Sequence, residues 1–383
     1  MAKLIEITGK ALSGEWGNDD EAGTGIPVLR TTNFTNDGVI NYNNVVTRDI
    51  PKKDLSQKYL QPGDIIIEKS GGSDKQPVGR VVYYDGEPNK FLFNNFTGVL
   101  RVRDRDAWHP RYVFYALYGN YANGGTRRYE NKTTGLHNLK TDQYVQDFAI
   151  QEQTLEYQQR VVLELDKVAE LIALRKEQLA KLDELVKSRF IELFENKYNT
   201  VKIGDVFKTT SGGTPSKAHP EYYEGGTIPW LSSGEVNAGI ISSVKNHITQ
   251  AGVDNSSAKM VPENSVVIAM YGATAGQVGL LRIATTTNQA VCSVLPNNSY
   301  VPEYLYYAAK SKKDWMISQC AGGAQPNISQ GIIRQMEIID APREKQEQFA
   351  TFVEQTDKSK LAIQQSLDKL ELLKKSLMQE YFG

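Results

Sequence analysis

Two stretches of the chain place apolar residues in alternating steps of three and four. The first runs from Gln153 to Phe194 and the second from Glu344 to Phe382. Such steps put the apolar side chains on one stripe of a helix, the a/d pattern of a coiled coil. The other positions are mostly charged or polar, so each stripe is buried best against a similar helix. We therefore expect two long helices that pair with each other, with a seam formed by Leu165, Val168, Ile172, Leu179, Leu182 and Val186 of the first and Ile363, Leu367, Leu370 and Leu377 of the second.

The alternative is that each long helix packs only against the segment that precedes it. A repeat favours the pair, because the two helices end alike: Leu-x-x-Leu-x-x-Leu-x-Lys-Ser closes at Ser188 and again at Ser376, a shift of 188 positions. The segments upstream of the helices also match in order. The matching pieces are Gly25–Leu29 with Thr227–Leu231, Gly63–Ile67 with Asn264–Ile268, Val78–Gly79 with Val278–Gly279, Asn94–Asn95 with Asn288–Gln289, and His137–Leu139 with Pro326–Ile328.

The upstream segments lack a helical period and consist of short β-branched or aromatic runs between turn residues. This pattern predicts short strands. The fold class is therefore mixed α/β (α+β): two β-rich globules, each with one helix, near Pro110 to Asn120 and near Pro302 to Lys312. We expect an internal pseudo-twofold repeat, with the globules separated by two long antiparallel coiled-coil helices. The predicted parts are globule 1 (1–150), the central helix (151–198), globule 2 (199–341) and the C-terminal helix (342–383).

Composition narrows the class of protein. At 383 residues, 40% hydrophobic and 23% charged, the chain is not a disordered tail, and its formal net charge of −1 excludes a histone-like polycation. A contact with a polyanion would need local patches, such as Arg127-Arg128 or the alternating Arg101, Arg103 and Arg105, which would share one face of a strand. That strand is equally compatible with a solvated sheet edge. We expect no membrane span and a cytoplasmic location.

The motifs of the common catalytic sites are missing from the sequence. The stretch Gly272–Gln277 has the glycines of a phosphate loop without its lysine, and no Pro-Pro dipeptide of an adenine methylase motif occurs. Asp64 with Glu68-Lys69 has the wrong spacing for a metal-dependent nuclease. Cys292 and Cys320 lie far apart, and the histidines are scattered, so no zinc or other metal site is expected. The chain is not expected to be an enzyme or to hold a cofactor.

Polar loops rich in glycine recur in both copies. Glycine lets a backbone approach a ligand closely, while amide, hydroxyl and guanidinium groups can bind base edges or phosphates. Taken singly, such a loop is more often ordinary turn chemistry. The candidate DNA-binding residues of copy one are Arg30, Thr31, Asn33, Lys69, Ser70, Arg80, Asn95, Arg127, Arg128, His137, Asn138 and Lys140. Those of copy two are Gly213, Thr214, Ser216, Trp230, Ser232, Ser233, Tyr271, Thr274, Gln277, Asn288, Gln289, Gln325 and Asn327.

This architecture, together with the loops, resembles the specificity subunit of type I restriction-modification systems over essentially the whole chain. The residues that carry the resemblance in copy two are Gly212–Ser216, Ile228–Trp230, Tyr271–Thr274, Thr287–Gln289, Gln325–Ser329 and the helix entry Ala341–Gln346. Those in copy one are Ile26–Arg30, Pro62–Ile65 and the helix after Gln151-Glu152-Gln153. Copy one departs from the family near its start, where Leu12–Gly17 replaces the Gly-Gly-Thr-Pro loop.

The resemblance implies a non-catalytic DNA-binding protein. Two target recognition domains would each read one half of a split sequence in the major groove of double-stranded DNA, and the helices would set an unread spacer. Because the two globules differ in sequence, the target would be nonpalindromic. The resemblance also implies two modification subunits that bring S-adenosylmethionine, and restriction subunits that use ATP and Mg. The alternatives are a scaffold that joins other subunits without reading bases, and a standalone nuclease or methylase.

Overall fold

The computed structural model describes residues 1–383 except 52–53, 134–135 and 321–326. Its contacts divide the chain into two compact units: unit 1 comprises Met1–Arg175 and Ser366–Gly383, and unit 2 comprises Lys176–Gln365. Both predicted long helices are present, as α4 (Leu155–Phe194) and α10 (Arg343–Phe382), and each contributes a segment to both units. This division cuts through the two helices, so the four parts expected from the sequence stay a prediction.

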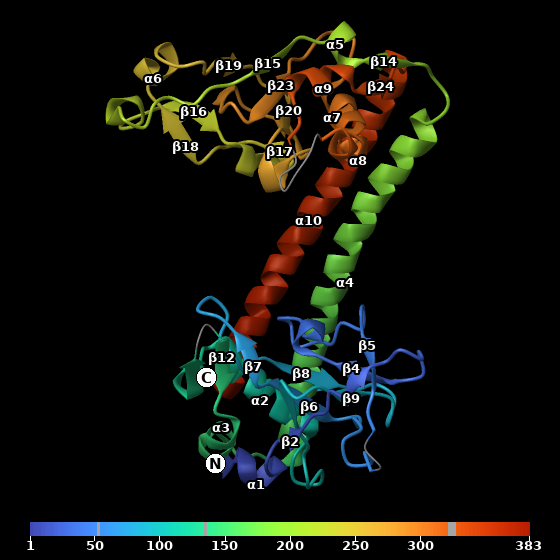
Figure 1. Cartoon of the computed structure of the whole chain (residues 1–383), viewed down its shortest axis with the longest axis vertical. Coiled ribbons are helices and arrows are strands. Elements are labelled where there is room, and N and C mark those ends of the chain that lie inside the picture. The colour runs from blue at the N-terminus through green and yellow to red at the C-terminus, as the bar shows by residue number, and fades with distance from the viewer. Residues whose placement is uncertain (52–53, 134–135, 321–326) are drawn as a thin grey trace. The chain divides into compact units, whose positions relative to one another are not determined.

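Within each unit, a segment of α4 packs against a segment of α10 (Figure 1). In unit 1 the Tyr381 hydroxyl donates to Glu164 Oε2 at 2.5 Å, and Arg175 donates to Ser366 at 3.2 Å. In unit 2 Lys360 donates to Asp183 at 2.6 Å. Later residues of α4 thus meet earlier residues of α10, so the paired segments run antiparallel. The prediction of an antiparallel helix pair is confirmed.

The heptad positions lie on the inner faces of these paired segments. Most of the other positions of the two helices are charged or polar. Buried positions of the stripe are Leu165, Val168, Ile172, Val186 and Leu367; half-buried ones are Leu179, Leu182, Ile363, Leu370 and Leu377.

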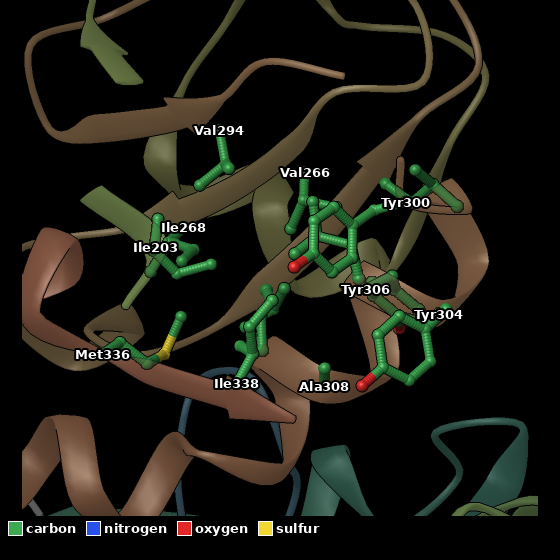
Figure 2. Packing of buried hydrophobic residues seen from close by; sticks show 14 of the residues in the cluster. Ile203, Val266, Ile268, Val294, Tyr300, Tyr304, Tyr306, Ala308, Met336 and Ile338 are labelled. Atoms are coloured by element: carbon green, nitrogen blue, oxygen red, sulfur yellow. The ribbon is translucent and has the colours of Figure 1, made fainter. Parts of the chain in front are cut away.

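In unit 2 the core forms on both faces of one central sheet. Strand β20 (Val266–Ala269) is apolar throughout and lies between β23 and β21. Because side chains alternate along a strand, Val266 and Ile268 face one apolar cluster, with Tyr304 of α7 (Figure 2), while Val267 and Ala269 face a second. The sheet runs β15 (Thr209–Ser211), β23 (Val291–Val294), β20, β21 (Val278–Leu281) and β17 (Ile240–Ile241).

Unit 1 is built in the same way around β6 (Asp64–Glu68). Ile65 and Ile67 face the cluster that contains α2 (Pro110–Ala122), and Ile66 faces a smaller cluster with Leu29. The sheet runs β2 (Leu12–Ser13), β10 (Thr97–Leu100), β6 and β8 (Val81–Tyr84). The helices expected near Pro110 and Pro302 are confirmed as α2 and α7 (Pro302–Ser311).

A second four-stranded sheet lies in each unit, and in both it contains one parallel strand pair. In unit 1 its order is β3 (Asn18–Asp19), β5 (Val46–Asp49), β4 (Ile26–Leu29) and β9 (Leu92–Phe93), with β4 and β9 parallel. In unit 2 it is β18 (Asn246–Ile248), β16 (Ile228–Leu231), β22 (Thr285–Thr287) and β19 (Met260–Val261), with β16 and β22 parallel.

The remaining elements complete the repeat. Unit 1 has β1 (Ala2–Lys3), which pairs with β13 (Ala149–Ile150), a sheet of β11 (Glu130–Thr133), β12 (Leu136–Leu139) and β7 (Ser70–Gly72), and helices α1 (Leu4–Thr8), η1 (Thr31–Asn33), η2 (Arg127–Tyr129) and α3 (Thr141–Asp147). Unit 2 has β14 (Thr200–Lys202), which pairs with β24 (Glu337–Ile339), and helices α5 (Ile203–Val206), η3 (Pro220–Tyr222), η4 (Ser233–Ala238), α6 (Gln250–Asp254), η5 (Gly272–Thr274), α8 (Lys313–Ser318) and α9 (Gln330–Gln335).

A buried glutamine near the start of each long helix ties that helix to its globule. Gln158 of α4 accepts from the His109 amide at 2.8 Å and donates to the Ala107 carbonyl at 2.9 Å. Gln346 of α10 accepts from the Val301 amide at 2.8 Å and donates to the Ala341 carbonyl at 2.8 Å. The amides that they bind belong to the residues just before Pro110 and Pro302, the first residues of α2 and α7. The two glutamines keep the 188-residue shift; the sequence analysis included Gln346 in the helix entry Ala341–Gln346 and did not name Gln158.

Replacing Gln346 with alanine is expected to lower the free energy of unfolding of unit 2 by about 2–4 kcal/mol, because it leaves buried backbone groups without partners. Denaturant titration of the full chain measures the loss. Gln348, exposed on the same helix, is the matched control, and its alanine variant should change stability by less than about 0.5 kcal/mol. Equal losses for the two variants would show that the buried hydrogen bonds contribute little.

Candidate nucleic-acid interface

In unit 2 the predicted loops gather where the parallel strands β16 and β22 end. Parallel strands bring their carboxyl ends to the same edge of a sheet. Ser232 and Ser233 follow β16, and Asn288 and Gln289 follow β22. We call this region the loop edge of unit 2; its residues are Gly212–Thr214, Ser232–Ser233, Tyr271–Thr274, Asn288–Gln289 and Asn327.

Backbone hydrogen bonds hold the loop edge of unit 2 together. The Gly213 amide donates to the Thr287 carbonyl at 2.9 Å, and the Asn288 amide donates to Leu231 at 3.0 Å. The Met270 amide donates to Ala290 at 2.8 Å, and the Ile328 amide donates to Met270 at 2.8 Å. Beside them, Tyr271 and Asn327 form an antiparallel bridge. Five segments that are far apart in the sequence therefore share one frame.

Side chains brace the first of these segments. Trp230 Nε1 donates to the Gly213 carbonyl at 3.0 Å, and the Thr214 hydroxyl donates to Gln289 Oε1. The Tyr223 hydroxyl donates to the Pro215 carbonyl, and burial raises the pKa of Tyr223. Thr214 and Gln289 remain exposed, so their polar groups are within reach of a ligand from outside.

The loop edge of unit 1 has the same frame with different side chains. The Glu15 amide donates to Phe93 at 2.8 Å, and the Asn94 amide donates to Leu29 at 3.0 Å. The Lys69 amide donates to Phe96 at 2.8 Å, and the Leu139 amide donates to Lys69 at 2.8 Å; Asn138 pairs with Ser70. These match the four bonds of unit 2 one for one. We define the loop edge of unit 1 as Gly14–Glu15, Arg30–Asn33, Lys69–Ser70, Asn94–Phe96 and His137–Asn138.

Gly14 takes the place that Gly212 has in unit 2. A Cβ on Gly14 would lie 2.1 Å from the Asn94 carbonyl oxygen, and a Cβ on Gly212 would lie 1.9 Å from that of Thr287. Only glycine permits either approach. The segment Leu12–Gly17 lacks the Gly-Gly-Thr-Pro sequence that the family has at this place. It nevertheless keeps the close glycine contact.

Arg80 is a bracing residue of this edge. Its guanidinium binds both carboxylate oxygens of Glu68, at 3.2 and 3.0 Å, and Glu68 is almost fully buried. It also donates to the carbonyls of Thr31 at 3.2 Å and Phe34 at 3.1 Å. A bidentate ion pair is strongly directional. Arg80 thereby fastens the Thr31–Phe34 turn onto β6.

Two further candidates are buried. Asn33 is 1% exposed, accepts from the Arg30 amide at 2.9 Å and donates to the Asn41 carbonyl at 3.0 Å. His137 lies 3.1 Å from Glu130 Oε2. Both side chains already have partners inside unit 1, which makes them positioning residues in this structure.

Unit 1 also contains a cavity of about 430 Å³. Lys75 and Arg127 line it together with the amides of Asn36, Gln76 and Asn123, and none of the lining residues that the structure describes is acidic. Tyr121 also lines it, and burial raises the pKa of its hydroxyl. A cavity with this lining suits an anionic or polar ligand.

The neighbouring Arg128 is not among these lining residues, and its guanidinium lies over the ring of Tyr129, 4.8 Å from the ring centroid.

The predicted strand of three alternating arginines is wrong. Strand β10 ends at Leu100, before the three arginines, so they do not alternate along a strand. Arg101 binds both oxygens of the buried Asp64 at 2.7 Å, and Arg105 donates to the Pro62 carbonyl at 2.8 Å. The hydrogen bonds to the Asp64 carboxylate raise the pKa of Arg101. Arg101 and Arg105 thus have partners inside the unit.

The other predicted residues divide by exposure. Gly213 is buried. Half-buried positions are Arg30, Thr31, Lys69, Ser70, Asn138, Trp230, Ser232, Ser233, Thr274, Gln277 and Asn288. Exposed positions are Asn95, Arg127, Arg128, Lys140, Thr214, Ser216, Tyr271, Gln289 and Asn327. Gln325 lies outside the described residues.

Within the described parts of the chain, no helix combines the length and apolarity of a membrane span. The same residues bring no three histidine, cysteine or acidic side chains together as a metal site.

Residues 195–372 match the family model described as the type I restriction modification DNA specificity domain. Over these residues the chain is similar to the specificity subunits of type I restriction-modification systems. Specificity subunits of these systems are non-catalytic. The match covers most of unit 2 and the greater part of α10.

Curated relatives match over a similar length. The EcoR124I/EcoR124II specificity subunit of Escherichia coli is 30% identical over 171 residues, 42% of this chain and 41% of that protein. The MjaIX specificity subunit of Methanocaldococcus jannaschii is 28% identical over 165 residues, 42% of this chain and 38% of that protein. The match thus spans about two fifths of the length of each of these relatives.

Solved structures extend the likeness of fold to the whole chain. The type I restriction-modification S subunit from M. genitalium has a TM-score of 0.58 at 14% identity and covers 100% of this chain and 95% of that one. A chain from a study of complex assembly and conformational transition of the type I R-M system has a TM-score of 0.59 at 17% identity, with 100% and 96% covered. These structures share the mixed α/β fold with two β-rich regions and two packed long helices.

Proposed function

We propose that this chain reads a bipartite, nonpalindromic sequence in double-stranded DNA as the specificity subunit of a type I complex. Residues 1–150 and 199–341 act as the two target recognition domains. The observation that carries the proposal is the pair of loop edges: four equivalent hydrogen bonds build the same frame in both units, whereas the side chains on it differ. A shared frame with unlike polar side chains suits two readers of unlike half-sites.

The long helices are proposed to set the spacer and to bind two modification subunits. Large apolar side chains are exposed on both helices outside the a and d positions of the seam, and exposed apolar surface marks protein contacts. They are Leu163, Leu171, Leu174, Leu185 and Ile191 of α4 and Leu361, Leu372 and Leu373 of α10. The modification subunits would bring S-adenosylmethionine, and restriction subunits would bring ATP and Mg.

Co-expression with the modification subunit in a host without DNA methylation tests the proposal. Sequencing of that host's DNA should reveal one split motif with two unlike halves. The exposed apolar residues of the long helices fit a DNA-reading subunit and a scaffold that only joins other subunits equally well. Selectivity for a base sequence distinguishes the two functions. A stable complex that modifies no defined sequence would favour the scaffold. Methylation by this chain without its partner would contradict both.

A further inference from the structure

The cavity of about 430 Å³ in unit 1 carries two cations, Lys75 and Arg127, and both are exposed. Within the described part of the chain, neither of them has an acidic partner at ion-pair distance. Arg80 and Arg101 of the same unit differ in this respect, because each binds a buried carboxylate, at 3.0 and 2.7 Å. We call this cavity the cationic cavity; its two positive charges are available to a ligand.

Both cations stand on turns whose backbones are held by hydrogen bonds. Lys75 lies in the turn Ser73–Gln76, whose end residues exchange two backbone hydrogen bonds, at 2.7 and 3.1 Å. Arg127 begins the short helix η2, just after α2. The Tyr121 hydroxyl of α2 donates to the Pro77 carbonyl at 3.3 Å and thereby joins the two turns. The backbones that carry the cations are therefore in place before a ligand binds, which lowers the entropic cost of binding.

The lining of the cationic cavity favours a phosphate group. Arginine binds phosphate through two parallel hydrogen bonds, and lysine binds it as a point charge. The side-chain amides of Asn36, Gln76 and Asn123 add further donors. The last turn of α2 also lines the cavity, and the carboxyl end of a helix carries about half a negative charge. Two full positive charges outweigh that charge, so the cavity as a whole attracts an anion.

The cationic cavity adjoins the loop edge of unit 1 on two sides. On one side Asp74, the residue before Lys75, lies 3.7 Å from Nε2 of His137, which belongs to the loop edge. On the other side the loop-edge segment Arg30–Asn33 leads within three residues to Asn36, which lines the cavity. Bases in the major groove are flanked by phosphates, because the groove is only about 12 Å wide. Cations beside a base-reading edge are therefore well placed for the phosphates that border the bases.

We propose that Lys75 and Arg127 bind one phosphate of the DNA backbone beside the half-site that unit 1 reads. The inference rests on the proposed function and adds to it a contact that supplies affinity without base preference, since the phosphates carry no sequence information. Arg128 takes no part in this contact, because it does not line the cavity and its guanidinium lies over the ring of Tyr129. The sequence analysis named the two arginines as one patch and did not name Lys75.

Duplexes in which one backbone phosphate at a time is replaced by an uncharged methylphosphonate test the contact. The complex of the full chain with its modification subunit is titrated with these duplexes, all of which carry the motif. At one position beside one half-site, the replacement should weaken wild-type binding about tenfold, the value of a charge-assisted hydrogen bond. Lys75→Gln and Arg127→Gln should both lose the response at that position. Each variant should also lower the slope of log affinity against log salt by about one.

The neighbouring arginine provides a matched control. Arg128→Gln removes the same charge one residue further along the chain, and it should keep the response at every position. Arg127→Lys retains the charge and should retain most of the response. All four variants should prefer the same motif as the wild type, because only the phosphate contact is changed. A folding defect of unit 1 would instead weaken the preference for its half-site.

Three results would contradict the inference. A full response at every position in Lys75→Gln and Arg127→Gln would mean that the two cations only neutralise the end of α2. Loss of the response in Arg128→Gln as well would indicate general charge and no defined site. Binding of inorganic phosphate that Arg127→Gln abolishes, without a DNA position that depends on Arg127, would assign the cavity to a small anion. A wild-type complex without sequence preference would instead refute the proposed function.

Discussion

Replacing Arg80 with methionine is expected to lower the free energy of unfolding of unit 1 by about 3–5 kcal/mol, because it leaves the carboxylate of Glu68 buried without its cation. The Glu68 side chain is 2% exposed, and Arg80 supplies two of its hydrogen bonds. The same change frees the carbonyls of Thr31 and Phe34. Hydrogen exchange of peptides from β6 and β8 in the full chain reports the loss within unit 1.

The double variant Glu68→Met with Arg80→Met is the decisive control. It removes both charges together, and an apolar pair of similar volume can replace a buried ion pair at little cost. We expect it to recover a large part of the stability that the single variant loses. If Arg80 instead acts only on DNA, Arg80→Met will keep wild-type exchange rates and lose only binding.

Replacing Phe194 with alanine is expected to destabilise unit 2 by about 3–5 kcal/mol, the usual cost of a large cavity in a packed core. Phe194 is fully buried at the end of α4. Its ring centroid lies 4.8 Å from that of Tyr304, 5.0 Å from Phe190 and 5.6 Å from Phe349. Four aromatic rings therefore meet there, and the loss is measured by denaturant titration.

The repeat supplies a matched control at Phe382, 188 positions later at the end of α10. Phe382 is half-buried, and its ring lies 5.1 Å from that of Tyr112. Because less of this ring leaves water, Phe382→Ala should cost about 1–2 kcal/mol, and the loss should appear in unit 1. Equal losses at the two positions would contradict this expectation, because they would mean that Phe194 and Phe382 contribute equally to packing.

Much of the loop edges was predictable from the order of polar motifs, but the roles of individual side chains were not. Thr214, Gln289 and Asn327 are exposed on the frame, as reading residues must be. Arg80 and His137 are instead bound to acidic residues within unit 1. The sequence shows that Arg80 is a cation. Whether its guanidinium is available to a ligand depends on the carboxylate of Glu68, which lies 12 residues away in the chain.

Whether a single aromatic ring is buried or exposed was not predictable either. A lone phenylalanine in a strand-rich segment is most often part of the core. Phe93, three residues earlier, is fully buried, while Phe96 lies in the turn before β10 and is exposed. Only the paired strands show which of the two rings faces water.

The sequence by itself determined the long helices, their seam and the repeat of 188 residues. These follow from local periodicity, because a stripe of apolar residues every three or four positions can be buried only as a helix against an apolar partner. The tertiary structure alone decided which polar residues are available to a ligand. It placed Gly14 in the position of Gly212, and it paired Arg101 with Asp64, 37 residues away. Such partners are brought together by sheet pairing between distant segments, and no local pattern records that pairing.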